Sequence, residues 1–264
     1  MSGLPRWRRA VAATAILLSI SSLSLVACSS PPRPTLESGD TLPKPSSSTT
    51  GPTTTVPDPY AHEVATAKAT GNIAVLKAAD GPVATTLTNP TPSHAPLVFL
   101  VKKDLGKWLD VYLPIRPNGS TGFVRKADMN VKTIDWRIDV SLSKFNLKVW
   151  DGAKLFLDAP IAVARENSPT PGGIYFITVL IQPVDAQGRP NPTGVYGPWA
   201  YGLSGFSDTY TSFNGGNGQL GIHGTNEPQL IGQRVSHGCI RMRNADIDKL
   251  QPVLPLGVPV SITA

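Results

Sequence analysis

Short apolar runs, separated every few residues by turn-forming Gly, Pro, Asn and Asp, fill the chain from about residue 60 to its end. One of them, KWLDVYLPI at 107–115, alternates Leu109, Val111 and Leu113 with residues of a different character. Alternation with a period of two places one set of side chains on each face of an extended strand. The sequence therefore predicts a mainly β protein.

Residues 60–131 hold several short strand signals separated by strong turns at 80–82 (Asp-Gly-Pro) and at 118–119 (Asn-Gly). Asn-Gly between two strand signals predicts a β-hairpin, and Asp-Gly-Pro favours a tight turn. Several short strands in a segment of this length favour a small barrel. The stretch 107–129 resembles bacterial SH3-like domains, which implies a small β module that supports its neighbour or binds a ligand of its own.

Residues 132–264 form a second region with the same β character. An Asp-Gly pair at 151–152 predicts a hairpin, and the final run at 257–264 predicts a closing strand. One helix is predicted at 244–254, where Asn244 is a good N-cap and the acidic residues that follow suit the positive first turn.

The first 27 residues carry Arg6, Arg8 and Arg9, then an apolar run and small residues, which is typical of a secretory signal peptide. The end of this segment, Leu25 to Cys28, resembles the lipobox of bacterial lipoproteins, which implies cleavage before Cys28 and attachment of lipid to it. The protein is then expected to be exported, anchored by lipid to the outer face of the cytoplasmic membrane and facing the cell wall. A plain secretory signal with a chance cysteine and an uncleaved anchor are the alternatives.

Residues 28–59 are dominated by Pro, Ser and Thr and offer almost nothing to bury. Such a composition predicts a disordered linker, either a spacer that holds a folded head away from a membrane or an expendable segment. Signal cleavage removes three of the 24 Lys and Arg and none of the 18 Asp and Glu, so the net charge of the remainder is +3. That charge is too weak to indicate a nucleic-acid partner.

Lipidation of Cys28 leaves Cys239 without a disulfide partner, and a lone thiol in an exported protein calls for a function. A nucleophilic thiol of ordinary pKa needs a base or a cation beside it, and His223 and His237 are the candidates. If the segment after residue 238 is extended, Ile240 and Met242 point to one side while Cys239 and Arg241 point to the other. Burial of the first pair then directs the thiol and the guanidinium into one positively biased space.

Gly238, directly before the cysteine, indicates a backbone with positive φ or a close approach to a ligand, in a turn that aims N–H groups at an oxyanion. The same residues allow four other interpretations. A zinc site of His223, His237 and Cys239 matches no structural zinc spacing, so no metal is expected. The remaining three are a buried inert cysteine, catalysis through Ser236, and an Arg241 that pairs with one of the acidic residues of the helix.

The segments IHGT (222–225) and RVSHGCIRM (234–242) resemble the active-site signature of the L,D-transpeptidases with a YkuD-type catalytic domain. SPTPGGIYFI (168–177) resembles an upstream segment of the same family. This resemblance covers about half of the chain. It implies a β-sandwich catalytic domain with one or two short helices at 132–264. Together with the SH3-like resemblance of the first region, the expected architecture is a small SH3-like barrel at 60–131 followed by this domain.

The resemblance also implies roles for individual residues. Cys239 is the nucleophile and His223 the general acid and base, while the carbonyl of Gly224 orients the imidazole. His237 and Gly238 shape the oxyanion pocket together with the Cys239 N–H.

In the same comparison, Ser236 and Arg241 stabilise the loop or bind a substrate carboxylate. The long Gly- and Pro-rich segment 182–218 is predicted to contribute a lid or substrate channel, with Tyr201 and Trp199 as candidate contacts. Core packing is the alternative role for either aromatic residue.

The reaction implied is cofactor-free acyl transfer on peptidoglycan. The thiol attacks the stem peptide after the L-centre of its third residue and releases D-Ala. The resulting thioester passes to an amine of another stem. Donor and acceptor stem peptides are the expected partners, and carbapenems the expected inhibitors. An L,D-carboxypeptidase that hydrolyses the same thioester and a non-catalytic wall-binding lipoprotein are the rival functions.

Overall fold

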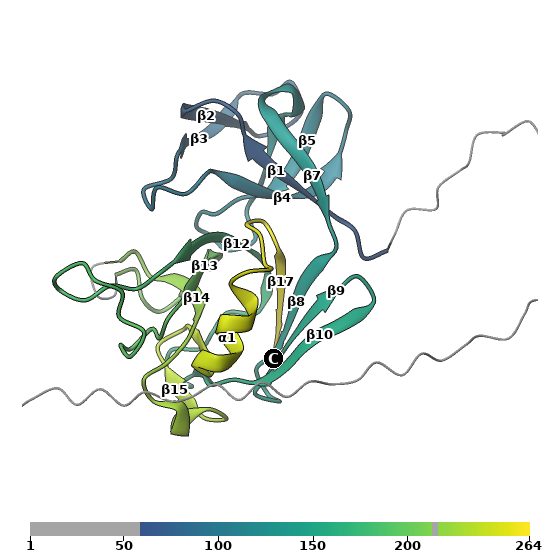
Figure 1. The fold of residues 1–264 in the computed structure, drawn as a ribbon. Helices are drawn as coiled ribbons and strands as arrows, with labels where there is room; N and C mark the ends of the chain where they lie inside the picture. Colours follow the sequence, from purple (N-terminus) through teal and green to yellow (C-terminus); the bar gives the residue numbers. More distant parts are fainter. Residues whose placement is uncertain (1–58, 213–215) are drawn as a thin grey trace, which may run out of the picture. The chain divides into compact units, whose positions relative to one another are not determined.

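The structure is a computed structural model that describes residues 59–212 and 216–264 (Figure 1). The predicted signal peptide, Cys28 and nearly all of the linker lie outside the described residues. The mainly β prediction is confirmed, because the described part holds seventeen strands and a single α-helix. None of its helices is long and apolar enough to cross a membrane.

The first sheet has seven strands and every pairing in it is antiparallel. Its order is β3 (Val83–Asn89), β2 (Gly71–Leu76), β6 (Thr121–Arg125), β5 (Trp108–Tyr112), β4 (Val98–Asp104), β1 (His62–Ala67) and β7 (Met129–Ile134). The predicted Asn-Gly hairpin joins β5 to β6, and Gly119 has a φ of 80°. A short 3-10 helix, η1 (Lys126–Asp128), precedes β7. The likeness to SH3-like domains stays a prediction.

The second sheet has eight strands in the order β10 (Lys154–Pro160), β9 (Asn146–Asp151), β8 (Trp136–Ser141), β17 (Pro259–Thr263), β12 (Gly173–Ile181), β13 (Ala200–Phe206), β14 (Gln219–His223) and β16 (Ile240–Arg241). The Asp-Gly hairpin between β9 and β10 and the closing strand β17 are confirmed. Two short strands, β11 (Val163–Ala164) and β15 (Arg234–Ser236), pair beside this sheet. The break between the two large sheets falls at Asp135, three residues after the predicted boundary.

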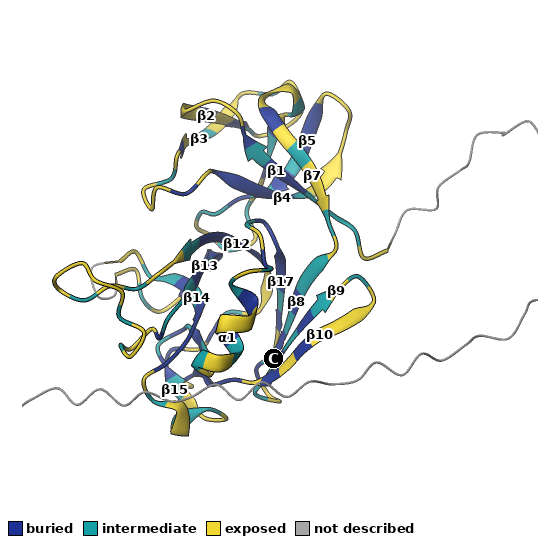
Figure 2. Ribbon diagram, viewed as in Figure 1, coloured by how far each residue is buried: buried dark blue, intermediate teal, exposed yellow. Residues whose placement is uncertain are grey.

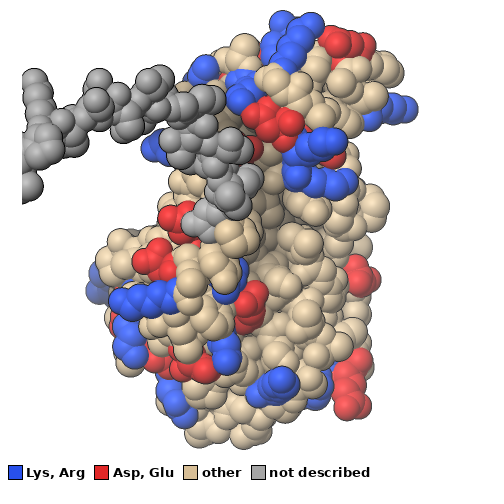
Figure 3. All heavy atoms as spheres, turned by 90° about the vertical axis from the view of Figure 1, so that its right-hand side faces the viewer, with Lys and Arg blue, Asp and Glu red and all other residues tan. Residues whose placement is uncertain are grey.

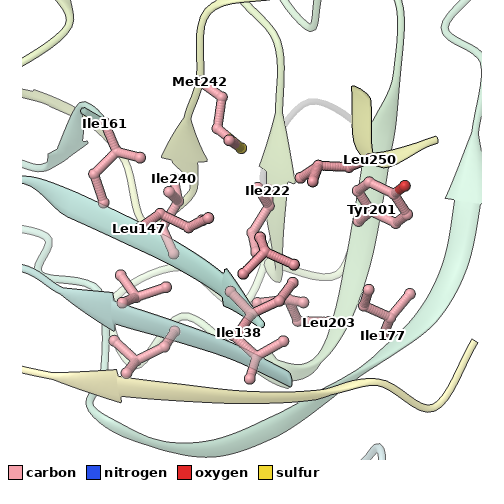
Figure 4. Close-up of a cluster of buried hydrophobic side chains, with 14 of the residues drawn as sticks. Ile138, Leu147, Ile161, Ile177, Tyr201, Leu203, Ile222, Ile240, Met242 and Leu250 are labelled. Carbon is pink, nitrogen blue, oxygen red and sulfur yellow. The ribbon is translucent and has the colours of Figure 1, made fainter. Parts of the chain in front are cut away.

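The core of the second half explains the shape of its sheet. Ile138 and Leu147, from β8 and β9, belong to the same buried cluster as Leu203, Ile222 and Ile240, from β13, β14 and β16 (Figure 4). Strands that lie so far apart in the sheet order share one core only if the sheet curls until its two ends face each other. The inner faces of the predicted sandwich therefore belong to one curled sheet. The central strands of this sheet are largely buried, whereas β10 at its edge is largely exposed (Figure 2).

The predicted helix is α1 (Asn244–Leu250), which buries Ile247 and Leu250 in this core. The prediction that Asn244 is its N-cap was wrong, because Arg243 holds that position and provides no side-chain cap. Asn244 is the first helical residue, and its Oδ1 accepts a hydrogen bond from the backbone N–H of Thr225 instead. The side-chain amide of Asn244 is thus used in a tertiary contact with Thr225, and it does not cap α1.

Charged side chains of both signs are interspersed on the face drawn in Figure 3, without one dominant basic patch. Mixed charges of this kind fit the weak net charge deduced from the sequence.

Candidate active site

Strands β14 and β16 place the histidine and the cysteine on the same side of the sheet. The two strands are parallel, with Ile222 opposite Ile240 and His223 opposite Arg241. Ile240 and Met242 are 1% and 0% exposed, whereas Cys239 and Arg241 line a pocket on the other face. The predicted alternation is confirmed, and the burial of the apolar pair directs the thiol outwards.

The same register brings Cys239 next to Gly221, two residues before His223 on β14. Positions offset by one strand and two residues have Cα atoms about 8 Å apart, a gap that a cysteine and an imidazole can close with their side chains. Both line one pocket of about 450 Å³. A Cβ built on Gly221 would lie 3.8 Å from the Cys239 sulfur, at van der Waals distance, which confirms that the thiol lies directly over this position of β14.

The turn before the thiol is fixed by hydrogen bonds from two hydroxyl groups. Ser236 Oγ donates to the Cys239 carbonyl at 2.5 Å and accepts from the Gly238 N–H at 3.3 Å. Thr170 Oγ1 donates to the Gly238 carbonyl at 2.8 Å. Gly238 itself has a φ of 138°, as the sequence predicted, which L-residues with a side chain rarely adopt.

The imidazole of His223 is oriented by the backbone. Its Nδ1 lies 2.6 Å from the carbonyl oxygen of Gly224, the contact expected from the sequence. Because a carbonyl can only accept, Nδ1 carries the proton and Nε2 is left as the basic nitrogen. The ring of Tyr196 packs edge-on against the imidazole, with the centroids 4.9 Å apart.

Burial moves the pKa values of both groups toward their neutral forms. Desolvation lowers the pKa of His223 from 6.5 to about 4, helped by the charge of Arg241 and opposed by the Gly224 carbonyl. Desolvation also raises the pKa of the half-buried Cys239 thiol, against the Gly221 N–H and the charge of Arg241. The pair is therefore a thiol and a neutral imidazole at neutral pH.

The pocket has a basic and polar floor with an apolar mouth. Arg241 lines it, and no Asp or Glu is found among its described lining residues. Ile181, Val195 and Tyr196, at the mouth, are 44%, 55% and 36% exposed. The alternative in which Arg241 pairs with an acidic residue of α1 does not hold, because Arg241 bonds to Glu227 at 2.8 Å. Glu227 precedes the short 3-10 helix η2 (Pro228–Leu230), on the turn that follows β14.

No group of three or more His, Cys, Asp or Glu side chains gathers as a metal site within residues 59–212 and 216–264. His223 packs on Tyr196, whereas His237 packs on Tyr210 with 5.8 Å between the ring centroids. The two imidazoles are thus held by different parts of the pocket wall.

Comparison with known proteins identifies the family of this region. A family model described as the L,D-transpeptidase catalytic domain matches residues 135–262. The chain is 40% identical over 134 residues to the Bacillus licheniformis protein named as L,D-transpeptidase YkuD. The aligned region covers 51% of this chain and 69% of that relative. This chain belongs to the L,D-transpeptidase family.

The Bacillus subtilis protein of the same name is 35% identical over 130 residues, which is 49% of this chain and 67% of that relative. Among solved structures, L,D-transpeptidase 3 from Mycobacterium tuberculosis in complex with a faropenem-derived adduct aligns with a TM-score of 0.42 and 17% identity, over 75% of this chain and 97% of that chain. The catalytic domain of the Enterococcus faecium L,D-transpeptidase acylated by ertapenem aligns with a TM-score of 0.34 and 20% identity, over 48% of this chain and 96% of that chain.

The long segment of the transpeptidase domain between β12 and β14 contributes much of the pocket wall, from 195–196, 200–202, Ser207, Tyr210 and 216–218. Trp199 is not among the described lining residues and packs against the hydrophobic core. The ring of Tyr201 lies in the hydrophobic core, 1% exposed, and its strand partner is Ile222 (Figure 4). A substrate contact for Tyr201 stays a prediction.

Sequence reasoning missed three contributors to this site. Tyr196 lies in a Gly- and Pro-rich stretch, and nothing local signals that it packs on the histidine. Thr170 belongs to the Pro-Thr-Pro-Gly segment, and that resemblance was the one signal that could have drawn attention to its hydroxyl. Arg116 lies just before the Asn-Gly hairpin of the first sheet, far from the site in sequence.

Arg116 supports the pocket wall from the first sheet. Its guanidinium donates to the carbonyl oxygens of Ser207, Tyr210 and Asn217 at 3.0, 3.0 and 2.9 Å. Asn118 adds a reciprocal pair, since its Oδ1 accepts from the Phe206 N–H and its Nδ2 donates to the Phe206 carbonyl, both at 2.8 Å. The first sheet therefore holds the two ends of the segment that leads from β13 to β14.

Proposed function

We propose that this protein is a cysteine-dependent acyltransferase that cross-links peptidoglycan, with Cys239 as nucleophile and His223 as general acid and base. One observation carries the proposal. The two side chains open onto one pocket from adjacent parallel strands, and the Gly224 carbonyl holds Nδ1 so that the basic Nε2 is free for the thiol proton. Family membership supports the same reaction class.

The first half-reaction forms a thioester. His223 Nε2 takes the proton from Cys239 as the sulfur attacks the carbonyl carbon of the third stem residue. The tetrahedral intermediate then collapses, the C–N bond breaks, and the imidazolium gives its proton to the departing D-Ala amine. Because the resting pair is neutral, proton transfer accompanies the attack and the thiolate does not form beforehand.

The second half-reaction transfers the acyl group. An amine of another stem attacks the thioester carbonyl, His223 accepts the amine proton, and the thiol leaves with that proton restored. We assign the backbone N–H of Cys239 as an oxyanion donor, presented by the turn that Ser236, Gly238 and Thr170 fix. A single oxyanion donor is worth about 10² to 10³ in turnover.

Arg241 is the one charged side chain of the described pocket lining, and its guanidinium forms an ion pair with Glu227 at 2.8 Å. Stem peptides carry carboxylates, and Arg241 is assigned to bind one of them, in exchange for or beside Glu227.

The deciding experiment incubates purified protein with a disaccharide tetrapeptide and follows the products by mass spectrometry. A cross-linked dimer identifies the transpeptidase, and a trimmed stem alone identifies the carboxypeptidase. Unchanged substrate identifies a binding protein. Cys239→Ala is the control, and a mass adduct after carbapenem exposure that is lost in Cys239→Ala identifies the nucleophile separately. One solved relative is acylated by ertapenem, which makes that carbapenem a suitable probe.

We further propose that the protein is exported and anchored through lipid on Cys28, on the strength of the signal-like segment and the Leu-Val-Ala-Cys sequence at 25–28. In the bacterial host, Cys28→Ser is expected to move the protein from the membrane to the soluble fraction. Retention of that variant in the membrane, at the same level as the parent, would contradict the anchor.

A further inference from the structure

We infer that Asn244 positions the catalytic imidazole through a single peptide unit, the one that joins Gly224 to Thr225. The inference rests on the role proposed above for His223. No catalytic or positioning role for Asn244 follows from the sequence, where the residue reads as a helix cap.

Both ends of that peptide unit are engaged. Its carbonyl oxygen, on Gly224, accepts from His223 Nδ1 at 2.6 Å. Its N–H, on Thr225, donates to Asn244 Oδ1 at 2.7 Å. A peptide unit is a rigid plane, so the carbonyl cannot turn from the imidazole without breaking the bond to Asn244 as well. Hydrogen bonds linked through one peptide also polarise each other, which strengthens the carbonyl as an acceptor.

The space around Oδ1 shows that this contact is built into the backbone. A Cβ on Gly197 or on Gly224 would collide with Asn244 Oδ1. Gly197 also has a φ of 64°, in the left-handed region that favours glycine. Two chain segments thus come together around one amide oxygen, and only glycine fits at either closest point.

Asn244 also reaches the second support of the imidazole. Its Nδ2 donates to the carbonyl of Pro192 at 3.3 Å. Pro192 lies on the loop that carries Tyr196, whose ring packs on His223. The amide therefore connects the peptide that orients the ring nitrogen with the loop that covers the ring face.

A purely helical role does not account for these contacts. Arg243 is the N-cap of α1, and Asn244 lies inside the helix, with its oxygen bonded to Thr225 and its nitrogen to Pro192. Loss of the amide leaves the hydrogen bonds of α1 itself unchanged. What it removes is the anchor that keeps the proton on Nδ1 and the basic Nε2 directed at the thiol.

The test uses the full chain with Asn244→Ala, Asn244→Asp and the control Asp248→Ala, an exposed residue on the same helix. The first measurement is the rate at which iodoacetamide alkylates Cys239, from pH 4 to pH 9. The second is the Nδ1 proton resonance of His223 in protein labelled with ¹⁵N-histidine, assigned by its loss in His223→Gln. Neither measurement depends on peptidoglycan chemistry.

Asn244→Ala is expected to lose or strongly shift the Nδ1 proton resonance. Its alkylation rate at pH 7 should fall by about tenfold or more, and cross-linking by up to about a hundredfold, the cost of a misplaced catalytic group. Asn244→Asp keeps an oxygen acceptor for Thr225, so the resonance should persist. Its added negative charge near the imidazole should move the acid limb of the alkylation profile to higher pH. Asp248→Ala should match the parent in all respects.

The inference is overturned if folded Asn244→Ala keeps both the parent Nδ1 resonance and the parent alkylation profile, even if its melting temperature falls. It is equally overturned if Asn244→Asp behaves as Asn244→Ala in both measurements, because the acceptor oxygen would then be irrelevant. Failure of the proposed function looks different: the parent forms no cross-link, while the alkylation and resonance changes still appear in the Asn244 variants.

Discussion

Acidification is expected to destabilise this protein through His223, and the structure sets the size of the effect. Burial lowers the pKa of this imidazole from 6.5 to about 4. Between about pH 4 and pH 6.5, His223 is protonated in the unfolded chain and neutral in the folded chain. The free energy of unfolding therefore falls as the pH drops through this window. The contribution is complete above pH 6.5 and exhausted below the folded pKa.

A gap of about 2.5 pKa units corresponds to about 3 kcal/mol, at 1.36 kcal/mol for each unit. Little discount for solvent screening applies, because the side chain is only 5% exposed. Such a loss is a large part of the stability of an ordinary domain, so the parent is expected to unfold in mild acid at much lower urea concentrations than at pH 7.

Urea unfolding of the parent and of His223→Gln, at half-unit steps from pH 4 to pH 8, measures this contribution. His62, whose pKa is also lowered by burial, and the carboxylates are present in both proteins, so they cancel in the difference. The difference curve should rise by about 3 kcal/mol between pH 4 and pH 6.5 and stay flat above. A flat difference throughout would mean that the pKa of the imidazole is the same in the folded and the unfolded chain, and the lowering of the His223 pKa by burial would have to be abandoned. A difference that falls as the pH rises would mean that the folded protein holds His223 protonated, which contradicts the neutral resting pair.

Three further changes test the supports of the site. Arg116→Ala removes three hydrogen bonds to the pocket wall and should lower the free energy of unfolding by about 1–2 kcal/mol and raise KM more than it lowers kcat; unchanged urea unfolding and KM would contradict the bracing role. Ser236→Ala removes the hydroxyl that fixes the turn before the thiol, so acylation by a carbapenem, measured by stopped flow, should slow by about tenfold or more. An unchanged acylation rate would show that this hydroxyl is not needed to present the oxyanion donor. Gly224→Ala places a methyl group against Asn244 Oδ1 and should lower the free energy of unfolding by about 1–3 kcal/mol, as measured by thermal unfolding. The control is Gly232→Ala, which has a φ of 91° and open space around its Cβ, so it introduces backbone strain without a steric collision.

The sequence was informative wherever the deciding physics is local. Hairpins at Asn-Gly and Asp-Gly pairs, the closing strand β17 and the outward direction of Cys239 all follow from turn chemistry or from a period of two. The contact of His223 with the Gly224 carbonyl was predicted from the resemblance to the L,D-transpeptidases, and it joins two adjacent residues. Each of these features is settled within a few residues.

What the sequence could not give depends on segments that meet only after folding. Asn244 was taken for a helix cap because a cap is what its local sequence predicts, and the N–H that it accepts from is nineteen residues earlier in the chain. Arg116 lies ninety-one residues before the first carbonyl that it supports. For Arg241 the sequence suggested the acids of the following helix as one possible partner, whereas the turn after β14 presents Glu227 to it. No period or turn signal carries such information.

The neutral resting pair has a consequence for the choice between the two proposed reactions. Burial lowers the pKa of His223 and raises that of Cys239, so both groups are neutral before the reaction. A neutral His223 is free to take a proton from either an amine or a water molecule, so base strength does not distinguish cross-linking from hydrolysis. We propose that access does, because the exposed side chains of Ile181 and Val195 offer an apolar surface to an acceptor stem, while a lone water gains nothing there. Replacing both residues by serine should therefore raise the ratio of trimmed stem to cross-linked dimer, and an unchanged ratio would show that the mouth does not select the acceptor.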